Sequence, residues 1–394
     1  MTFPLTARPA VLALRASKIR EVANAGMGRD DVLPFWFGEP DEVTPEFIRR
    51  AAIGALEAGE TFYTQNLGIP SLRSTIAAYA SRLHRPTAVD EIAVTNSGMS
   101  ALMLVTQALV GPGDRTVIVT PMWPNLVEIP RILGAEAVTF PLNFGPRGWT
   151  LDLDGLLAAL TPDTRMLYLN SPNNPTGWTI DRDALAAVLA HCRRHGIWIL
   201  SDDAYERLYY GPGEIGAAAP SFLDLAHPDD RVVSTNTFSK SWLMTGFRLG
   251  WIVAPPPLVE QIAKLIEYNT SCAPGFVQRA GDVAIREGEP IIAHTQARFR
   301  AARDHLVAKL NTLPGIEAAL PSGAMYVFFR VGGMTDSLAF CKRLVETVGL
   351  GLAPGIAFGP EGEGFVRWCF AADIGRLDAG LARLEQGLAL RAAA

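Results

Sequence analysis

Residues 234–251 read STNTFSKSWLMTGFRLGW, and this stretch is the most informative part of the chain. It places Lys240 among small hydroxyl residues, and Arg248 follows further along the same stretch. A lysine amine can condense with an aldehyde, and a guanidinium group can hold a phosphate through several hydrogen bonds. The stretch therefore predicts an enzyme that tethers an aldehyde cofactor carrying a phosphate.

Short apolar segments alternate with longer segments of helical periodicity on either side of this stretch. The helical spacing is clear in Ala101–Val110 and Asp183–His195, and Gly196 follows where a helix commonly ends. This alternation predicts an α/β domain with a mostly parallel sheet, in which ligands bind beyond the carboxyl ends of the strands. The expected strands are Glu91–Thr95, Thr116–Thr120, Met166–Leu169, Ile197–Leu200 and Arg231–Ser234.

The two ends of the chain flank this core and are expected to build a second, smaller α/β domain. The N-terminal part predicts an amphipathic helix over Leu12–Ala25. The C-terminal third predicts a long charged helix over Gly288–Asn311 and then a strand over Ala324–Val331. We therefore expect a large domain at residues 46–285 and a small domain formed by residues 1–45 and 286–394.

The composition is typical of a soluble globular enzyme, with 49% hydrophobic and 19% charged residues in a chain of 394. The net charge of −5 argues against nucleic acid as a partner, and no apolar stretch is long enough to span a membrane without Pro, Gly or charge. The four cysteines are far apart and lack metal-ligand spacing. We expect no metal site and reduced thiols in a cytoplasmic protein, although a chance cysteine pairing stays open.

Polar and aromatic residues follow the expected strands. Gly98 precedes a helix, whose free N–H groups suit a phosphate, and Trp123 follows the next strand. Asn174 begins an Asn-Pro-Thr-Gly sequence, and Asp202 and Tyr205 form an Asp-x-Ala-Tyr pattern. Each feature also has an ordinary structural interpretation, such as a turn, a helix-capping aspartate, a packing tyrosine or a half-buried tryptophan.

Taken in order, these motifs cover roughly residues 35 to 370 and resemble the fold-type I, class I/II aminotransferases, which use pyridoxal phosphate (PLP). The resemblance implies a large domain with a mostly parallel mixed sheet plus a smaller α/β domain. It also implies that Lys240 bonds covalently to PLP and shuttles a proton. Asp202 would pair with the pyridine nitrogen, Tyr205 and Asn174 would hydrogen-bond the ring oxygen, and Trp123 would stack on the ring.

The resemblance also assigns the phosphate site and a second subunit. The residues implied around the phosphate are Ser97, Gly98, Met99, Thr237, Ser239 and Arg248, and Thr237 holds a place usually taken by serine. Tyr63 resembles the tyrosine that reaches the phosphate of the neighbouring subunit. The active site would then be complete only in a homodimer.

Arg367 is the candidate for binding the substrate carboxylate. It lies inside the apolar segment Phe365–Phe370, where a lone charge is costly unless it is paired. In the resemblance this arginine holds the carboxylate, and Gly38 and Asn174 are the other substrate-binding residues. An arginine on an edge strand is the alternative interpretation.

The implied reaction moves an amino group from an L-amino acid to a 2-oxo acid by ping-pong kinetics. Met99 stands where members selective for acidic side chains often have lysine, and Phe35, Trp36 and Phe37 are expected near the entrance. Both features favour a neutral or aromatic donor. A PLP-dependent C–S β-lyase, or a relative of the cyclopropane-forming synthases, is the alternative. A PLP-sensing DNA-binding regulator is disfavoured because no basic DNA-binding domain precedes the fold.

Overall fold

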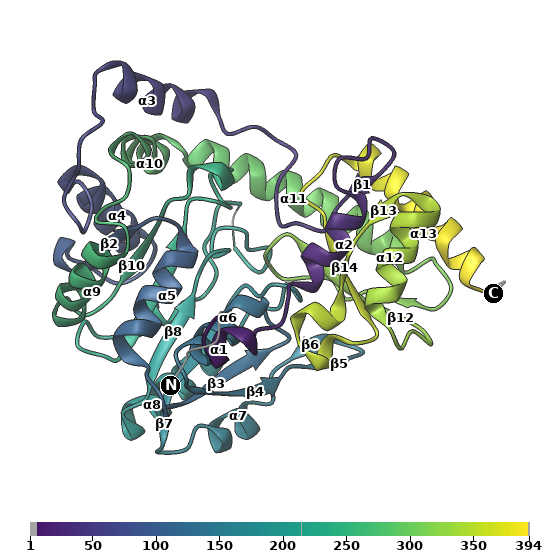
Figure 1. Ribbon diagram of the computed structural model, residues 1–394, viewed down its shortest axis with the longest axis horizontal. Coiled ribbons are helices and arrows are strands. Elements are labelled where there is room, and N and C mark those ends of the chain that lie inside the picture. Colours follow the sequence, from purple (N-terminus) through teal and green to yellow (C-terminus); the bar gives the residue numbers. More distant parts are fainter. Residues whose placement is uncertain (1–5, 214, 393–394) are drawn as a thin grey trace.

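A computed structural model describes residues 6–213 and 215–392, and it has two lobes that lie side by side (Figure 1). The larger lobe contains a seven-stranded sheet. Its strands are β2 (Ile92–Thr95), β3 (Arg115–Thr120), β4 (Glu136–Pro141), β7 (Thr164–Asn170), β8 (Trp198–Asp202), β9 (Val232–Thr237) and β10 (Gly250–Val253). They lie in the order β2-β10-β9-β8-β7-β3-β4, and only β10 runs antiparallel to its neighbours. The predicted mostly parallel sheet and its five expected strands are thus confirmed.

Helices cover both faces of the large sheet, which explains why its strands are apolar without alternation. Successive side chains of β3 point to opposite faces, so Val117 and Val119 join one core cluster and Ile118 joins another. The first cluster includes α7 (Leu153–Ala159) and α8 (Arg182–His195). The second includes α5 (Gly98–Leu109), α6 (Pro124–Ile132) and α9 (Pro256–Asn269).

Local sequence signals set the ends of helix α8. Its N-cap Asp181 accepts a hydrogen bond from the amide of Ala184 at 2.8 Å. At the other end, Gly196 takes the left-handed conformation with φ +69° and donates to the carbonyl of Cys192. The predicted helix and its terminal glycine are therefore confirmed.

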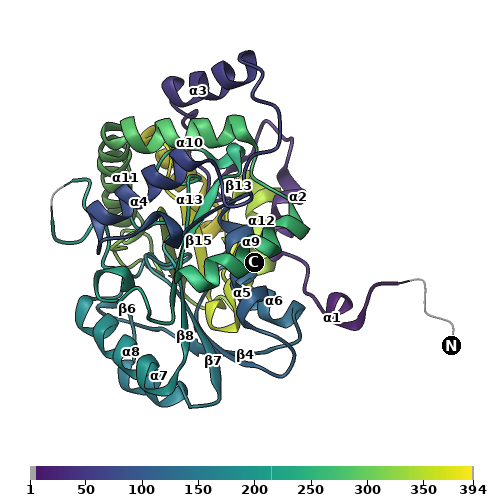
Figure 2. The same ribbon diagram turned by 90° about the vertical axis from the view of Figure 1, so that its left-hand side faces the viewer.

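A third group of helices packs over strands β2 and β10 at one edge of the large sheet. It comprises α3 (Glu46–Glu57), α4 (Pro70–Leu83) and α10 (Gly275–Glu287), and α3 lies at the periphery in both views (Figures 1 and 2). From here α11 (Glu289–Leu310) runs into the smaller lobe and confirms the predicted long helix.

The smaller lobe combines residues from both ends of the chain (Figure 1). Its antiparallel sheet has the order β11-β12-β15-β14, and β12 confirms the strand predicted over Ala324–Val331. The N-terminal strand β1 pairs with β13. The domain limits at residues 45/46 and 285/286 stay a prediction. The elements are α2 (Lys18–Gly26), β1 (Leu33–Pro34), β11 (Ile316–Glu317), β12 (Tyr326–Val331), α12 (Ser337–Val348), β13 (Leu350–Gly351), β14 (Ala353–Pro354), β15 (Phe365–Cys369) and α13 (Ile374–Ala392).

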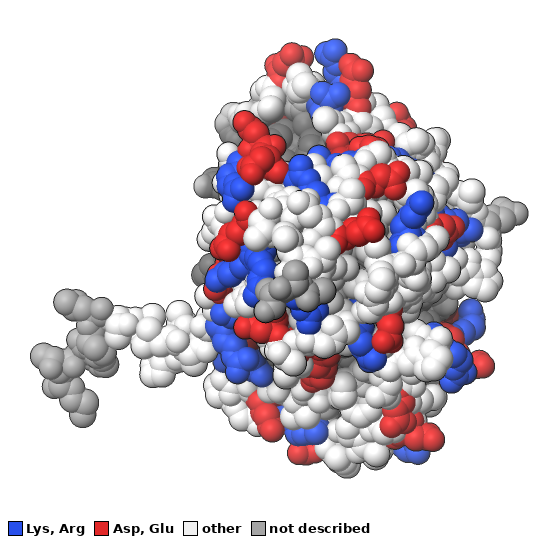
Figure 3. All heavy atoms as spheres, turned by 90° about the vertical axis from the view of Figure 1, so that its right-hand side faces the viewer, with Lys and Arg blue, Asp and Glu red and all other residues white. Residues whose placement is uncertain are grey.

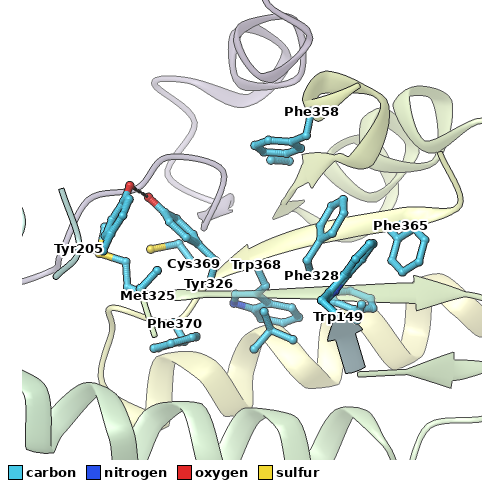
Figure 4. Close-up of a cluster of buried hydrophobic side chains, with 14 of the residues drawn as sticks. Trp149, Tyr205, Met325, Tyr326, Phe328, Phe358, Phe365, Trp368, Cys369 and Phe370 are labelled. Carbon is cyan, nitrogen blue, oxygen red and sulfur yellow. Dashed lines mark hydrogen bonds between the residues drawn. The ribbon is translucent and has the colours of Figure 1, made fainter. Parts of the chain in front are cut away.

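An aromatic cluster joins the two lobes (Figure 4). The hairpin of β5 (Asn143–Gly145) and β6 (Gly148–Thr150) carries Trp149 against the small sheet. Its ring centroid lies 5.7 Å from that of Phe328 and 5.0 Å from that of Phe365. Because these rings are large and mostly buried, their contact fixes how the lobes meet along this side.

The N-terminal helix differs from its prediction. A short α1 (Pro9–Leu12) lies at the periphery in Figure 2, and α2 begins only at Lys18. The physical reason is local, because Ser17 accepts a hydrogen bond from the amide of Arg20 and so starts a new helix, while α1 has no buried residue to extend it. The Leu12–Ala25 helix is therefore wrong in its first half.

Within residues 6–213 and 215–392, every helix is too short or too polar to span a membrane. Figure 3 shows acidic and basic side chains interspersed on one face of the molecule. All four cysteines are free thiols. Single 3₁₀ turns lie at η1 (Val89–Glu91), η2 (Phe222–Asp224), η3 (Thr245–Phe247), η4 (Gly355–Phe358) and η5 (Pro360–Gly362).

Candidate functional site

A cavity of about 490 Å³ opens where the carboxyl ends of the large-sheet strands meet the small sheet. It gathers segments that lie far apart in the sequence, from the N-terminal helix α2 to strand β15. All but two of the predicted site residues line it, namely Gly38, Gly98, Met99, Trp123, Asn174, Asp202, Tyr205, Thr237, Ser239, Lys240, Arg248 and Arg367. The position agrees with the rule that ligands of α/β sheets bind beyond the strand ends.

Lys240 reaches this cavity just after strand β9. Its Nζ donates a hydrogen bond to the carbonyl of Gly38 at 2.7 Å and lies 5.8 Å from the centroid of the Tyr205 ring. Removal from water disfavours the charged ammonium and lowers the pKa of Lys240 to about 8. A lysine with this pKa is partly neutral near physiological pH, so it can act as a nucleophile and as a base.

Asp202 is the last residue of strand β8 and is buried. Burial is the main reason that the pKa of its carboxyl is raised to about 7, with the charge of Asp203 adding to the effect. No lysine, arginine or histidine in residues 6–213 and 215–392 forms an ion pair with Asp202. Its carboxylate accepts one backbone hydrogen bond, from the amide of Ala204 at 3.3 Å. A buried carboxylate without a cationic partner is costly, so this position suits a cationic ligand group.

A group of hydrogen-bond donors also lines the cavity. The amino end of α5 begins at Gly98, beside the hydroxyl groups of Thr237 and Ser239. Thr237 Oγ1 donates to Ser239 Oγ at 2.9 Å, and Arg248 Nη1 lies 3.3 Å from the same oxygen. Arg248 holds a left-handed backbone with φ +53°, a strained conformation that is often found at ligand sites. Helix N–H groups, hydroxyls and a guanidinium together suit a dianion.

Arg367 is buried in strand β15, between β12 and β14. The edge-strand interpretation is therefore wrong, because strands flank β15 on both sides. Its Nη1 donates to Asn174 Oδ1 at 2.8 Å, Nη2 donates to the carbonyl of Trp36, and Nε has no hydrogen-bond partner. Arg367 also makes no ion pair with any described carboxylate. The site thus holds a buried cation that lacks an anion.

Two predicted residues lie outside the cavity lining. Ser97 is buried, and its hydroxyl accepts a hydrogen bond from the amide of Ser100 as the N-cap of α5. Tyr63 is 90% exposed and lines a separate surface cleft with Phe62, Thr270 and Phe276. In a single chain Tyr63 therefore takes no part in this cavity.

The expectation of three aromatic residues at the entrance is wrong for two of them. Phe35 and Trp36 are only 3% and 4% exposed and belong to the core of the smaller lobe. Phe35 packs on Trp368 with 5.1 Å between ring centroids, and Trp36 fills the space beside Gly351. Phe37 alone of the three lines the cavity, because Phe35 and Trp36 are taken up by these contacts within the smaller lobe.

Sequence reasoning missed several residues that line the cavity. Tyr326, the first residue of β12, places its hydroxyl 2.8 Å from that of Tyr205. Asn125 donates to the sulfur of Met99 at 3.3 Å, and the Arg20 guanidinium lies 5.3 Å from the centroid of the Phe37 ring. A tyrosine at the start of an apolar strand was the one available signal for Tyr326. Within the described ranges, no group of three or more His, Cys, Asp or Glu residues could hold a metal.

The model of the family described as aminotransferase class I and II matches residues 30–384. An aspartate aminotransferase of Pyrococcus horikoshii is 33% identical over 96% of both chains, and aromatic-amino-acid aminotransferase 2 of Thermococcus litoralis is 30% identical over 94% of this chain and 95% of its own. The crystal structure of a Thermotoga maritima aspartate aminotransferase superposes with a TM-score of 0.88 at 31% identity, covering 97% of this chain and all of that one. The chain therefore belongs to the aminotransferase class I and II family and is a PLP-dependent aminotransferase.

Proposed function

We propose that the enzyme transfers an amino group from an L-amino acid to a 2-oxo acid, with Lys240 as the proton carrier. One observation carries the proposal, which is that the cavity joins a lysine of lowered pKa to two buried ionisable groups that lack an oppositely charged partner. Asp202 supplies the unpaired anion and Arg367 the unpaired cation. A ligand pair that brings a cationic ring and a carboxylate would satisfy both.

The residues present fit PLP. Asp202 would hold the protonated ring nitrogen, and the amino end of α5 with Thr237, Ser239 and Arg248 would hold the phosphate. When bound, PLP supplies an electron sink that stabilises negative charge at the substrate Cα. The Nζ of Lys240 then takes a proton from that carbon and returns one later in the cycle.

We infer ping-pong kinetics from a carboxylate site that both substrates would share. Arg367 is buried in strand β15 and lines the cavity together with Gly38. Donor and acceptor both carry an α-carboxylate, so we infer that they use the same arginine and bind one after the other. Asn174 supports this arrangement because its Oδ1 fixes the guanidinium.

We propose a neutral or aromatic donor. Met99, Leu102, Trp123 and Phe37 make part of the cavity wall apolar, and Met99 offers no charge to a side-chain carboxylate. Relatives carry names that include both aspartate and aromatic amino acids, so the lining rather than the family supports this choice. Met99→Lys tests it, because a new cation should raise kcat/KM for aspartate relative to phenylalanine. Unchanged relative rates would count against the donor assignment.

We also propose that the enzyme is a homodimer in which Tyr63 serves the neighbouring site. Tyr63 and Phe62 are 90% and 85% exposed in the single chain, which is unusual for adjacent aromatic residues. The four free cysteines suit a reducing compartment, and we infer that the enzyme works in the cytoplasm.

One experiment tests the function and separates it from the C–S β-lyase, which the comparisons do not favour. The holoenzyme is mixed with single amino acids in the absence of any 2-oxo acid, and the products are counted per active site. A transaminase releases one 2-oxo acid per site and stops until an acceptor is added. Continued release of pyruvate and ammonia would contradict the proposal, and so would full activity of Lys240→Ala.

A further inference from the structure

Tyr326 and Tyr205 form a buried pair of hydroxyl groups at the cavity (Figure 4). Their oxygens are 2.8 Å apart, and the two side chains are only 1% and 5% exposed. Tyr326 comes from the small sheet and Tyr205 follows strand β8 of the large sheet. The pair thus connects the two lobes at the cavity, where the Nζ of Lys240 lies 5.8 Å from the centroid of the Tyr205 ring.

Each hydroxyl group of this pair has one proton, which limits the hydrogen bonds that the pair can donate. A phenol has one O–H to donate and can accept through its oxygen. The Tyr326 hydroxyl has no hydrogen-bond partner other than Tyr205 among the described residues. If Tyr205 donates its proton to a ligand, Tyr326 must donate to Tyr205, because otherwise a buried hydroxyl would keep its proton unbonded.

Its neighbours hold Tyr326 in place. A side-chain carbon at position 38 would overlap its hydroxyl, so Gly38 packs its backbone directly against that group. The Arg367 guanidinium lies 4.4 Å from the centroid of the ring, on top of the tyrosine. A ring held between these two residues has little freedom to turn its hydroxyl elsewhere.

We propose that Tyr326 is a positioning residue that donates a hydrogen bond to Tyr205 and so directs the Tyr205 proton towards the ring oxygen of PLP. The inference rests on the proposed role of Tyr205 as the donor to that oxygen. Tyr326 acts through Tyr205, because its hydrogen bond keeps the Tyr205 O–H pointing towards that oxygen.

The test is Tyr326→Phe, which removes the hydroxyl and keeps the ring. A hydrogen bond to the ring oxygen stabilises negative charge on it, which favours loss of the proton from the nitrogen that joins the cofactor to the lysine. Weakening this hydrogen bond should therefore raise the pH at which the bound cofactor changes its visible absorption. We expect Tyr326→Phe to raise this midpoint by about 0.5 to 1 pH unit, the size of one neutral hydrogen bond. Tyr205→Phe should raise it further, and the apoenzymes of both variants should bind PLP more weakly in a fluorescence titration.

Two comparisons separate positioning from a structural role. In the double variant Tyr205→Phe, Tyr326→Phe, the midpoint should equal that of Tyr205→Phe alone, because Tyr326 acts only through Tyr205. Tyr210→Phe is the matched control, since Tyr210 is also buried but donates to the carbonyl of Ala324 outside the cavity. It should lower the melting temperature and leave the midpoint unchanged.

Three results would overturn the inference. The first is an unchanged midpoint in Tyr326→Phe, the second is an additive shift in the double variant, and the third is an equal shift in Tyr210→Phe. A higher KM with an unchanged midpoint would mean that Tyr326 serves the substrate carboxylate through Gly38 and Arg367 instead. If the wild-type protein itself shows no pH-dependent visible band with PLP, the proposed cofactor role of the site fails rather than this inference.

Discussion

Arg367 Nη1 donates to Asn174 Oδ1 over 2.8 Å, across 193 positions of sequence. The bond ties strand β15 of the small sheet to the loop after strand β7 of the large sheet. It occupies the amide oxygen of Asn174, and the amide NH₂ donates to no residue of the described structure. One asparagine can therefore orient the arginine and still offer a donor to a ligand.

Arg367→Lys should raise KM for the amino acid strongly and should change the affinity for PLP much less. Lysine cannot form the two parallel hydrogen bonds of a guanidinium with a carboxylate. Losing one charged hydrogen bond, worth about 1.5–3 kcal/mol, should lower kcat/KM about 10- to 100-fold. Steady-state kinetics with a fixed acceptor give this value.

Arg303→Lys is the control for that substitution. Arg303 is also buried, but it bonds to Asp304 and the carbonyl of Pro321 away from the cavity. Its variant should lose stability and keep its KM. If KM rises equally in both variants, the assignment of Arg367 to the substrate is wrong.

The rate of PLP uptake by the apoenzyme should follow the ionisation of Lys240. Only the neutral amine attacks an aldehyde, and burial lowers the pKa of this lysine to about 8. The rate should rise with pH up to about 8 and then level off. Stopped-flow absorbance measures it, and borohydride reduction with peptide mass analysis identifies the lysine. A rate that keeps rising to pH 10 would mean that the amine titrates like an exposed lysine.

Asp202→Asn should stabilise the apoenzyme and disable the holoenzyme. The carboxyl titrates at about 7 in the folded chain and at 3.8 in the unfolded one, so between these pH values the wild-type apoenzyme loses stability as the pH rises. Asparagine removes this loss, which at about 1.4 kcal/mol per pKa unit is on the order of 4 kcal/mol above pH 7 and vanishes below about pH 4. Urea unfolding at several pH values measures it.

The same variant should lose most of its turnover, because an amide cannot keep the ring nitrogen protonated. A variant that unfolds more easily than wild type at pH 8 would contradict the unpaired state of Asp202 in the apoenzyme. A variant with normal turnover would contradict the pairing with the cofactor.

Mixing two defective variants tests the shared active site. Tyr63→Ala should bind PLP weakly and Lys240→Ala should be inactive, yet their mixed dimers contain one site with both residues intact. Activity at low PLP should therefore appear after the two are unfolded and refolded together. Each variant refolded alone is the control. If the mixture gains nothing although size measurements show mixed dimers, Tyr63 does not act across the interface.

The sequence by itself determined the residues whose role follows from local position. Lys240, Asp202 and Asn174 each come at or just after a strand of a mostly parallel sheet. The carboxyl ends of such strands meet at one edge, so residue type and strand order were enough to bring the three together. The cap at Gly196 was also predictable, because the end of a helix depends on the few residues around it.

The tertiary structure alone decided the direction of side chains whose partners are distant in sequence. Packing against Trp368 and beside Gly351 buried the rings of Phe35 and Trp36 in the core. The meeting of the two lobes placed the hydroxyl of Tyr326 against that of Tyr205. In both cases the cause is packing between segments more than one hundred residues apart, and a side chain's burial and hydrogen bonds depend on that packing rather than on its neighbours in the chain.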